Sequence, residues 1–416
     1  MKKNILVFCL ILLCSFGLFA GGNNDAESAK EVTLTFYGFS DWVTSAPYAS
    51  VWEAAKAQFE AENPGYKIEL QSDPYGDWDA KYKTMFAAGN PADVFMVNNP
   101  DFPTFANSGN LLNMDNFVDA GFFSRFYSGV QGMYRWQGAN MGMAFTTDCR
   151  ILWYNKDIFA EAGLDPNKAP TTWAELEAFA LQITERTGKY GFGMDLGLVE
   201  FPMQGVFNAS NASIINVAAD GSITPNVDTP EFRQYLAMLV AMKPSFEPDY
   251  ATLNHHDVAR LFAEGQMGMI VGNTLADTTI RETSWYGQAL LPKQNASAPN
   301  GSFGGGFGIC VSAKTKAPEQ AVKFAEILTS AKFNAGLIGD IPANPDALEA
   351  YALATDPTMQ VYLDQIQYAR QAQPKTLFFV EIDRAVYDAV VSVLVGGTSI
   401  DNAITSLTAT INNIIR

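Results

Sequence analysis

Two short segments near the start of the chain combine aromatic side chains with carboxylates, and a third combines amides with a carboxylate. Each segment comes directly after a stretch whose apolar pattern predicts a β-strand. An aromatic ring can stack on the C–H face of a pyranose, and a carboxylate or an amide can hydrogen-bond its hydroxyls. In open α/β sheets, ligands bind beyond the carboxyl ends of the strands. The segments therefore predict one wall of a sugar site, made by Asp41 and Trp42, by Tyr75 and Trp78, and by Asn98 and Asp101.

These residues also have a purely structural interpretation. Asp41 can cap a helix that follows it, with Trp42 packed as an ordinary core aromatic. Trp78 can fix the next helix against the sheet. Residue type and spacing alone leave both interpretations open.

The elements that position these residues alternate between strand and helix. Strands are predicted over residues 32–37, 66–71 and 92–97, with helices over residues 50–62 and 82–88 between them. This βαβαβ order is typical of an open sheet covered by helices on both faces.

The same alternation continues later in the chain. Thr172 and Glu175 have the spacing of a capping box, which predicts a helix start. Apolar periodicity and turn residues then predict helices over residues 257–264 and 318–329 and a last helix with one apolar face from Ile400 to Ile415. Strands are predicted over residues 267–271 and 308–312.

The first residues have the pattern of an export signal. Lys2 and Lys3 precede an apolar stretch of about 15 residues, shorter than the roughly 20 that a spanning helix needs. Small residues follow, so residues 1–20 are predicted to be a signal peptide and residues 21–31 a flexible segment. Lipid attachment at Cys14 is the alternative, although Leu13 stands where a small residue is preferred. We expect an exported protein, in the periplasm or on the outer face of the cytoplasmic membrane.

Composition narrows the classes of function. The 416 residues are 48% hydrophobic and 17% charged, as in a globular chain of two or three domains. The net charge of −17 argues against nucleic acid and anionic lipid as partners. Cys149 and Cys310 are expected to be buried free thiols, and the two histidines are adjacent. We therefore expect no metal and no cofactor, and the usual enzymatic motifs are not found.

Five segments, in a fixed order, resemble a known family. They resemble the extracellular solute-binding proteins of family 1, the sugar-binding components of ABC importers, which are related to maltose-binding protein. The strongest local match is Tyr154–Phe159 followed by Thr171–Leu176. The five segments are Phe59–Leu70, Gly89–Asp115, Phe145–Thr184, Leu261–Asn273 and Gly304–Ser330.

The resemblance implies an α/β fold of the type II periplasmic-binding-protein class. Two lobes are joined by a hinge that the chain crosses several times, and the ligand lies in the cleft between them. The crossings are expected near residues 145–150, 306–309 and 340–349. The implied lobes are residues 32–147 plus 308–345, and residues 148–307 plus 346–416.

The resemblance also implies cleft residues. Asp148 matches a family position whose acid faces the cleft, and Asn98 and Asp101 lie where the family places polar contacts. Arg150 is either a further contact or the structural partner of Asp148.

The second lobe offers weaker candidates. Asp195 and Glu200 lie in an irregular stretch, and Asn273 follows a predicted strand. The family often has a tryptophan after that strand, but this chain does not. Phe307, in a glycine-rich segment, is therefore expected to supply an aromatic face.

These inferences predict capture of a sugar or oligosaccharide by a monomer, which delivers it to the subunits of an ABC permease without catalysis. Within the same fold, a polyamine or glycerol phosphate is the alternative. A diamine suits acidic aromatic loops, whereas a phosphate requires Arg or Lys. A secreted glycoside hydrolase is the alternative from another class, because its two carboxylates can be any of the 44 acidic residues.

Overall fold

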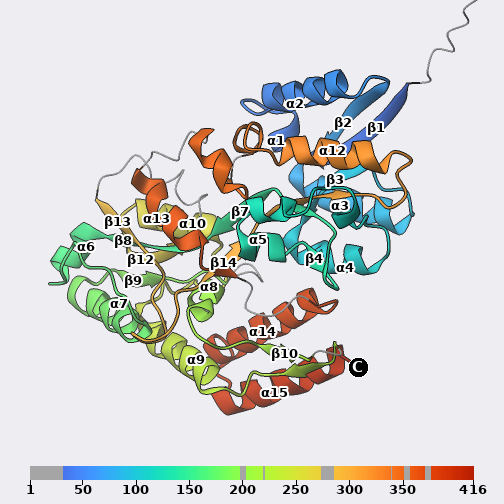
Figure 1. Cartoon of the computed structure of the whole chain (residues 1–416). Helices are drawn as coiled ribbons and strands as arrows, with labels where there is room; N and C mark the ends of the chain where they lie inside the picture. The colour runs from blue at the N-terminus through green and yellow to red at the C-terminus, as the bar shows by residue number, and fades with distance from the viewer. Residues whose placement is uncertain are drawn as a thin grey trace, which may run out of the picture.

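Two separate sheets, linked by a third small one, organise the chain (Figure 1). The computed structural model describes residues 31–196, 203–218, 221–272, 285–338, 340–350, 357–370 and 376–416. The predicted signal peptide, including Cys14, lies outside the described residues. Among the described residues, no helix combines the length and the apolar character that crossing a membrane requires.

The first sheet has the strand order β2-β1-β3-β15-β6. β1 pairs in parallel with β2 and β3, as the predicted βαβαβ order requires. β15 comes from much later in the chain and lies antiparallel between β3 and β6. The strands are β1 Val32–Phe39, β2 Tyr66–Asp73, β3 Val94–Asn98, β15 Phe307–Val311 and β6 Met143–Ala144.

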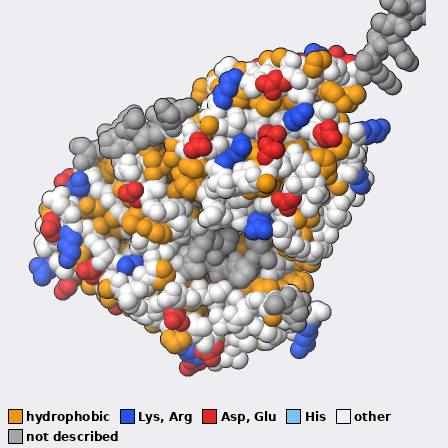
Figure 2. Space-filling view, viewed as in Figure 1, with side chains coloured by type: hydrophobic (Ala, Val, Ile, Leu, Met, Phe, Trp, Pro, Cys, Tyr) orange, Lys and Arg blue, Asp and Glu red, His pale blue; other side chains and the backbone are white. Residues whose placement is uncertain are grey.

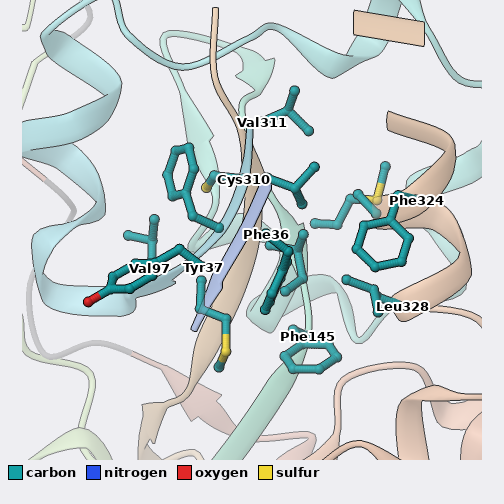
Figure 3. Packing of buried hydrophobic residues seen from close by; sticks show 14 of the residues in the cluster. Phe36, Tyr37, Val97, Phe145, Cys310, Val311, Phe324 and Leu328 are labelled. Carbon is teal, nitrogen blue, oxygen red and sulfur yellow. The ribbon is translucent and has the colours of Figure 1, made fainter. Parts of the chain in front are cut away.

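Two helices pack together on one face of this sheet. They are α2 (Ala49–Glu62) and α12 (Pro318–Leu328). The Phe36 ring lies 4.8 Å from that of Trp52 and 6.1 Å from that of Phe324. Figure 3 shows the side chains of α12 directed toward the sheet. Segments far apart in sequence therefore share one apolar core.

α3 (Tyr75–Ala87) covers the opposite face, where the rings of Phe86 and Phe95 lie 4.9 Å apart. Phe95 is the register partner of Tyr37, next in sequence to Phe36, so the two helical layers contact alternate residues of the strands.

The second sheet has the order β13-β8-β12-β9. β12 is parallel to β9 and antiparallel to β8, with Gly272 opposite Ile151. The carboxyl ends of β9 and β12 therefore lie at the edge where β8 begins. The strands are β13 Tyr286–Ala289, β8 Ile151–Asn155, β12 Met267–Gly272 and β9 Tyr190–Gly193.

Alternate residues of β8 belong to two different cores. Leu152 and Tyr154 contribute to a cluster with α7, α9, α14 and α15. Ile151 and Trp153 contribute to a cluster with α10 and α13, where Trp153 Nε1 donates to Tyr362 Oη at 3.1 Å. These helices are α7 Trp173–Thr187, α9 Pro230–Met242, α14 Phe379–Leu394, α15 Ile400–Ile414, α10 His255–Ala263 and α13 Pro357–Ile366.

A four-stranded hinge sheet, of order β16-β7-β14-β17, lies between the two larger sheets (Figure 1). Consecutive strands β6, β7 and β8 belong to the first, the hinge and the second sheet, and β13, β14 and β15 lead back. β16 forms a third crossing. The hinge strands are β16 Ile341–Pro342, β7 Thr146–Cys149, β14 Ser302–Gly305 and β17 Ala369–Arg370.

Shorter elements complete the described chain. The helices are α1 Ser40–Val43, α4 Phe102–Asn107, α5 Ser128–Gly132, α6 Lys156–Glu161 and α8 Met203–Asn208, and the strands are β4 Arg135–Trp136, β5 Ala139–Asn140, β10 Ile215–Val217 and β11 Ile223–Pro225. The 3₁₀ turns are η1 Asn99–Asp101, η2 Met114–Asn116, η3 Phe122–Arg125, η4 Lys243–Ser245, η5 Asn334–Gly336 and η6 Pro345–Ala350.

Local sequence explains where α7 begins. Thr172 Oγ1 accepts a hydrogen bond from the Glu175 backbone N–H at 3.2 Å, as the capping-box pattern predicts. The Glu175 carboxylate, however, accepts from the backbone N–H and hydroxyl of Thr171, at 2.8 and 2.7 Å. The second half of the box is therefore displaced by one residue.

Two predicted loops are helical. α3 begins at Tyr75, not at residue 82, and α1 contains Asp41 and Trp42. Tyr75, Trp78 and Tyr82 recur at helical spacing, and Asp77 in the first turn complements the positive end of the helix dipole.

Cys149 and Cys310 are both free and buried, which confirms the prediction. On the face shown in Figure 2, acidic and basic side chains are interspersed and do not form single-sign fields.

Candidate functional site

Five aromatic rings meet at the carboxyl end of the first sheet. The ring centroid of Phe39, the last residue of β1, lies 4.5 Å from Trp42, 5.5 Å from Tyr75 and 5.2 Å from Phe307. Trp78 lies 5.4 Å from Phe39 and 5.9 Å from Phe307. We call these five residues the aromatic cluster. The structure thus brings together four of the residues that the sequence singles out.

The rings of the aromatic cluster differ in accessibility. Tyr75 is 46% exposed, and Trp42 and Phe307 are partly buried. Trp78 is 0% exposed, with its ring 5.8 Å from Tyr75 and 4.8 Å from Tyr82 at small interplanar angles. Trp42, Tyr75 and Phe307 can therefore offer a face to a ligand, whereas Trp78 supports them from the core.

Polar side chains flank the aromatic cluster unevenly. Asp41 is exposed next to Trp42, and Asn98 is the register partner of Phe307. Asp101 is engaged elsewhere, since its Oδ2 accepts from Tyr82 Oη at 2.9 Å and lies 3.1 Å from Lys83 Nζ. Asp41 and Asn98 are thus better placed than Asp101 to bind a hydroxyl.

An ion pair lies at the end of β7 in the hinge sheet, with Asp148 inside the strand and Arg150 directly after it. Arg150 Nη1 lies 2.5 Å from Asp148 Oδ2, with the two side chains only 12% and 16% exposed. The guanidinium also lies 5.2 Å from the ring centroid of Phe303. Asp148 Oδ1 is buried without a hydrogen-bond partner in the described part of the chain. Asp148 therefore has a structural partner and retains one oxygen for a further contact.

A short stretch of backbone connects this ion pair to the aromatic cluster. β14 pairs with β7, which contains Asp148, and β14 leads directly into β15, which begins with Phe307. Asp148 is opposite Gly305 in the hinge sheet, and Gly305 is two residues before Phe307 in the chain. Gly306 between them has φ +121°, and a Cβ there would lie 2.2 Å from the Thr146 carbonyl oxygen. Only glycine fits this link without strain.

The second lobe contributes less to the described site. Asp195 follows β9 and is only 4% exposed. Glu200 and Asn273 lie outside the described residues.

His255, expected on a helix surface, is half-buried at the start of α10. Burial, followed by repulsion from His256 and Arg150, lowers the pKa of His255 to about 4. Its Nε2 has no hydrogen-bond partner among the described residues. His255 therefore lies near the hinge ion pair as a neutral side chain, whereas His256 is exposed.

Sequence reasoning missed Phe39 and Asp340. β1 continues to Phe39, two residues beyond the predicted strand end. The alternating pattern of the strand continues over these two residues and could have indicated Phe39. Asp340 directly precedes β16, which pairs with β7, and burial together with Asp148 raises its pKa to about 7. Nothing in the local sequence indicates that neighbour.

A cavity of about 440 Å³ opens at the opposite edge of the first sheet. Two of its charged groups already have partners, since Asp93 accepts from the Thr35 backbone and hydroxyl, and Lys314 Nζ donates to the Gly89 carbonyl. It lies at the amino ends of β1 and β3, away from the aromatic cluster, and we do not assign it to the site. In the described ranges, no group of three or more His, Cys, Asp or Glu could hold a metal ion.

Residues 42–335 match the family described as bacterial extracellular solute-binding protein. The chain belongs to this family. Among curated solute-binding proteins, it is 25% identical over 356 residues to the diacetylchitobiose binding protein DasA of Streptomyces coelicolor, covering 79% of each chain. It is 26% identical over 310 residues to the sn-glycerol-3-phosphate-binding periplasmic protein UgpB of Escherichia coli, covering 68% of this chain and 69% of UgpB.

The fold matches that of solved solute-binding proteins. The sugar-binding protein MalE of Xanthomonas citri superimposes with a TM-score of 0.78 over 92% of this chain and 97% of MalE, at 23% identity. The chain therefore has the two-lobe, hinged fold that its sequence predicts.

Proposed function

We propose that this solute-binding protein captures a neutral sugar or oligosaccharide in the interlobe cleft and delivers it to the membrane subunits of an ABC permease. The aromatic cluster carries the proposal, because it offers three partly accessible rings at the sheet edge where α/β proteins bind ligands. Asp41, Asn98 and Asp148 supply oxygen atoms for sugar hydroxyls. The names of DasA and MalE support a sugar ligand.

The lobe boundaries remain part of this proposal: residues 32–147 plus 308–345, and residues 148–307 plus 346–416. The apolar clusters support them, because one cluster joins residues 34–145 to residues 309–343 while the other two lie mostly outside these ranges. We further propose an exported monomer, which is either free in the periplasm after loss of residues 1–20 or, as the alternative, anchored through Cys14.

Glycerol phosphate is the second candidate, favoured by the relative UgpB. A phosphate requires an available cation. Among the described side chains at the hinge, Arg150 is already paired with Asp148, and the aromatic cluster is flanked by Asp41. We therefore rank a neutral sugar above an anion. Catalysis is not part of the proposal, and release of reducing sugar from oligosaccharides by the purified protein would contradict it.

Thermal-shift screening of the mature chain tests the proposed function. The panel contains maltotriose, cellobiose, N,N′-diacetylchitobiose, glycerol 3-phosphate and putrescine. A ligand at a hundred times its Kd should add about 2.7 kcal/mol to the free energy of unfolding. Stabilisation by a saccharide is the expected result. Stabilisation by glycerol 3-phosphate or putrescine alone would overturn the sugar assignment.

A further inference from the structure

Asp148, in β7, and Asp340, directly before β16, are neighbours in the hinge. β7 and β16 pair antiparallel, with Ile341 opposite Thr147. The same register, continued by one residue, sets Asp340 opposite Asp148. Directly opposed residues of an antiparallel pair share one face of the sheet, with Cβ atoms about 4.5–5.5 Å apart. Two carboxylates at this distance repel each other when both are ionised.

Among the described side chains, Arg150 is the cation beside this pair of acids. Arg150 Nη1 contacts Asp148 Oδ2, and Asp148 Oδ1 is buried without a partner in the described chain. With both carboxylates ionised, the three groups carry one uncompensated negative charge. With one proton on the pair, they are neutral.

The other described titratable neighbours of this pair are Tyr48, Tyr134, Cys149 and His255, none of which supplies a positive charge near neutral pH. Tyr48, at the start of α2 in the first lobe, faces Asp340, since burial and the charge of Asp340 raise the pKa of Tyr48. On the other side of Asp148, Gly305 has no side chain. Near Arg150, the half-buried imidazole of His255 stays neutral. Burial and Asp148 raise the pKa of Asp340 to about 7 against the attraction of Arg150, although Asp340 keeps part of its surface exposed.

We propose that Asp340 is a positioning residue of the solute site, which takes up a proton beside Asp148 and so couples capture of a neutral solute to proton uptake at the hinge. This inference rests on the proposed function, because Asp148 is the hinge acid that meets the solute. Lobe closure removes water from the hinge, which favours the neutral form of a carboxyl group. The proton comes from solvent and binds to the carboxyl group of Asp340.

The sign of the pH dependence follows from this proton uptake. Below about pH 6, Asp340 already carries its proton, so the Kd for a neutral saccharide should not change with pH. Above pH 7, binding must first protonate Asp340, so the Kd should rise by up to about tenfold per pH unit. An amine ligand would supply a positive charge itself and would show the opposite trend.

The test uses calorimetry on the mature chain with the tightest-binding saccharide of maltotriose, cellobiose and N,N′-diacetylchitobiose. Titrations run from pH 5.5 to 8.5 in two buffers of different ionisation enthalpy, which counts the protons taken up. Wild type should take up part of a proton at pH 7.5. Asp340→Asn, which mimics the neutral acid, should bind without proton uptake and lose the pH dependence. Asp346→Asn changes an exposed acid in the same crossing and should behave like wild type.

A second measurement works without ligand. The raised pKa of Asp340 means that the folded chain loses stability as pH rises from about 4 to about 7. The melting temperature of Asp340→Asn relative to wild type should therefore become more positive across this range. If the melting temperatures do not show this trend, the protonation of Asp340 in the folded chain is overturned. A trend in melting temperature with pH-independent saccharide binding would overturn the coupling alone. If no saccharide binds, the proposed function fails, and the coupling fails with it. The melting curves still decide whether Asp340 is protonated in the folded chain.

Discussion

Gly305 lies directly opposite Asp148 in the hinge sheet, and a Cβ on Gly305 would come within 2.3 Å of Asp148 Oδ1. The Asp148 carboxylate therefore occupies space that any other residue at position 305 would fill. Because Arg150 holds the second oxygen, the carboxylate cannot turn aside without losing its ion pair.

Gly305→Ala should displace the Asp148 carboxylate and disturb the Arg150 pair. We expect a loss of about 1–3 kcal/mol in the free energy of unfolding, as for overpacking of a tight site, and weaker saccharide binding. Gly132→Ala is the matched control, because no atom lies within 4 Å of its added Cβ. Urea unfolding and calorimetry on both variants measure the two effects. Equal behaviour of the two variants would show that Asp148 has room to move.

Gly306→Ala tests the link between hinge and first lobe. The new Cβ would meet the Thr146 carbonyl at 2.2 Å, in addition to the strain of φ +121°. Gly138→Ala has φ +86° but no atom within 4 Å, so it measures the cost of conformation alone. We expect roughly 1 kcal/mol for position 138 and clearly more for position 306, from thermal melts. A similar cost at both sites would contradict the steric argument.

Trp42→Ala and Trp78→Ala should have different effects. Trp42 is partly exposed, so its loss should weaken saccharide binding by about 1–3 kcal/mol and leave the melting temperature nearly unchanged. Trp78 is fully buried, so its loss should lower the free energy of unfolding by about 3–5 kcal/mol. Calorimetry and urea unfolding on both variants separate the roles. Unchanged affinity in Trp42→Ala would return this residue to a purely structural role.

Asp148→Asn should affect both stability and affinity. It removes the ion-pair charge that Asp148 offers to the mostly buried Arg150, which should cost a few kcal/mol, about 3 or less, because the pair retains some exposure. If Oδ1 also accepts a sugar hydroxyl, affinity should fall about tenfold to a hundredfold. Melting of the unliganded variant and calorimetry distinguish the contributions. A lower melting temperature with unchanged affinity would assign Asp148 to the ion pair alone.

His255 predicts weaker stability in mild acid. Its pKa is lowered from the ordinary value of 6.5 to about 4, so the folded chain favours the neutral imidazole. The stability difference is present above pH 6.5 and is lost as pH falls toward 4. His255→Gln should reduce this decrease in the free energy of unfolding by about 1–2 kcal/mol, a figure that allows for the partial exposure of the side chain. His256→Gln is the comparison, because it removes only the repulsion from His256 and leaves the burial of His255, so it should reduce the slope of melting temperature against pH less than His255→Gln does.

The sequence predicts elements better than it predicts their partners. β1, β2 and β3 are found within a few residues because their apolar residues mark the buried strands. The start of α3 was missed, since Gly76 and two acidic residues weaken the helical pattern there. The hinge strands β16 and β17 have two residues each, too few for a periodic pattern, and exist because tertiary contacts align them.

The candidate site shows the same limit. Trp42, Tyr75 and Phe307 were found because aromatic rings at strand ends are informative. The burial of Trp78 and the opposition of Asp340 to Asp148 depend on packing and on strand register, which a single sequence does not encode locally.

The place of β15 inside the first sheet also has a consequence for the order of folding. β15 inserts between β3 and β6, although it is synthesised long after both. Until residue 311 has emerged, those two strands expose unpaired edges, and the sheet cannot be completed. Such high contact order slows folding. We therefore expect that a growing chain stays unfolded for most of its synthesis, a state in which a chain can pass through a narrow secretion channel and in which holding chaperones would find it.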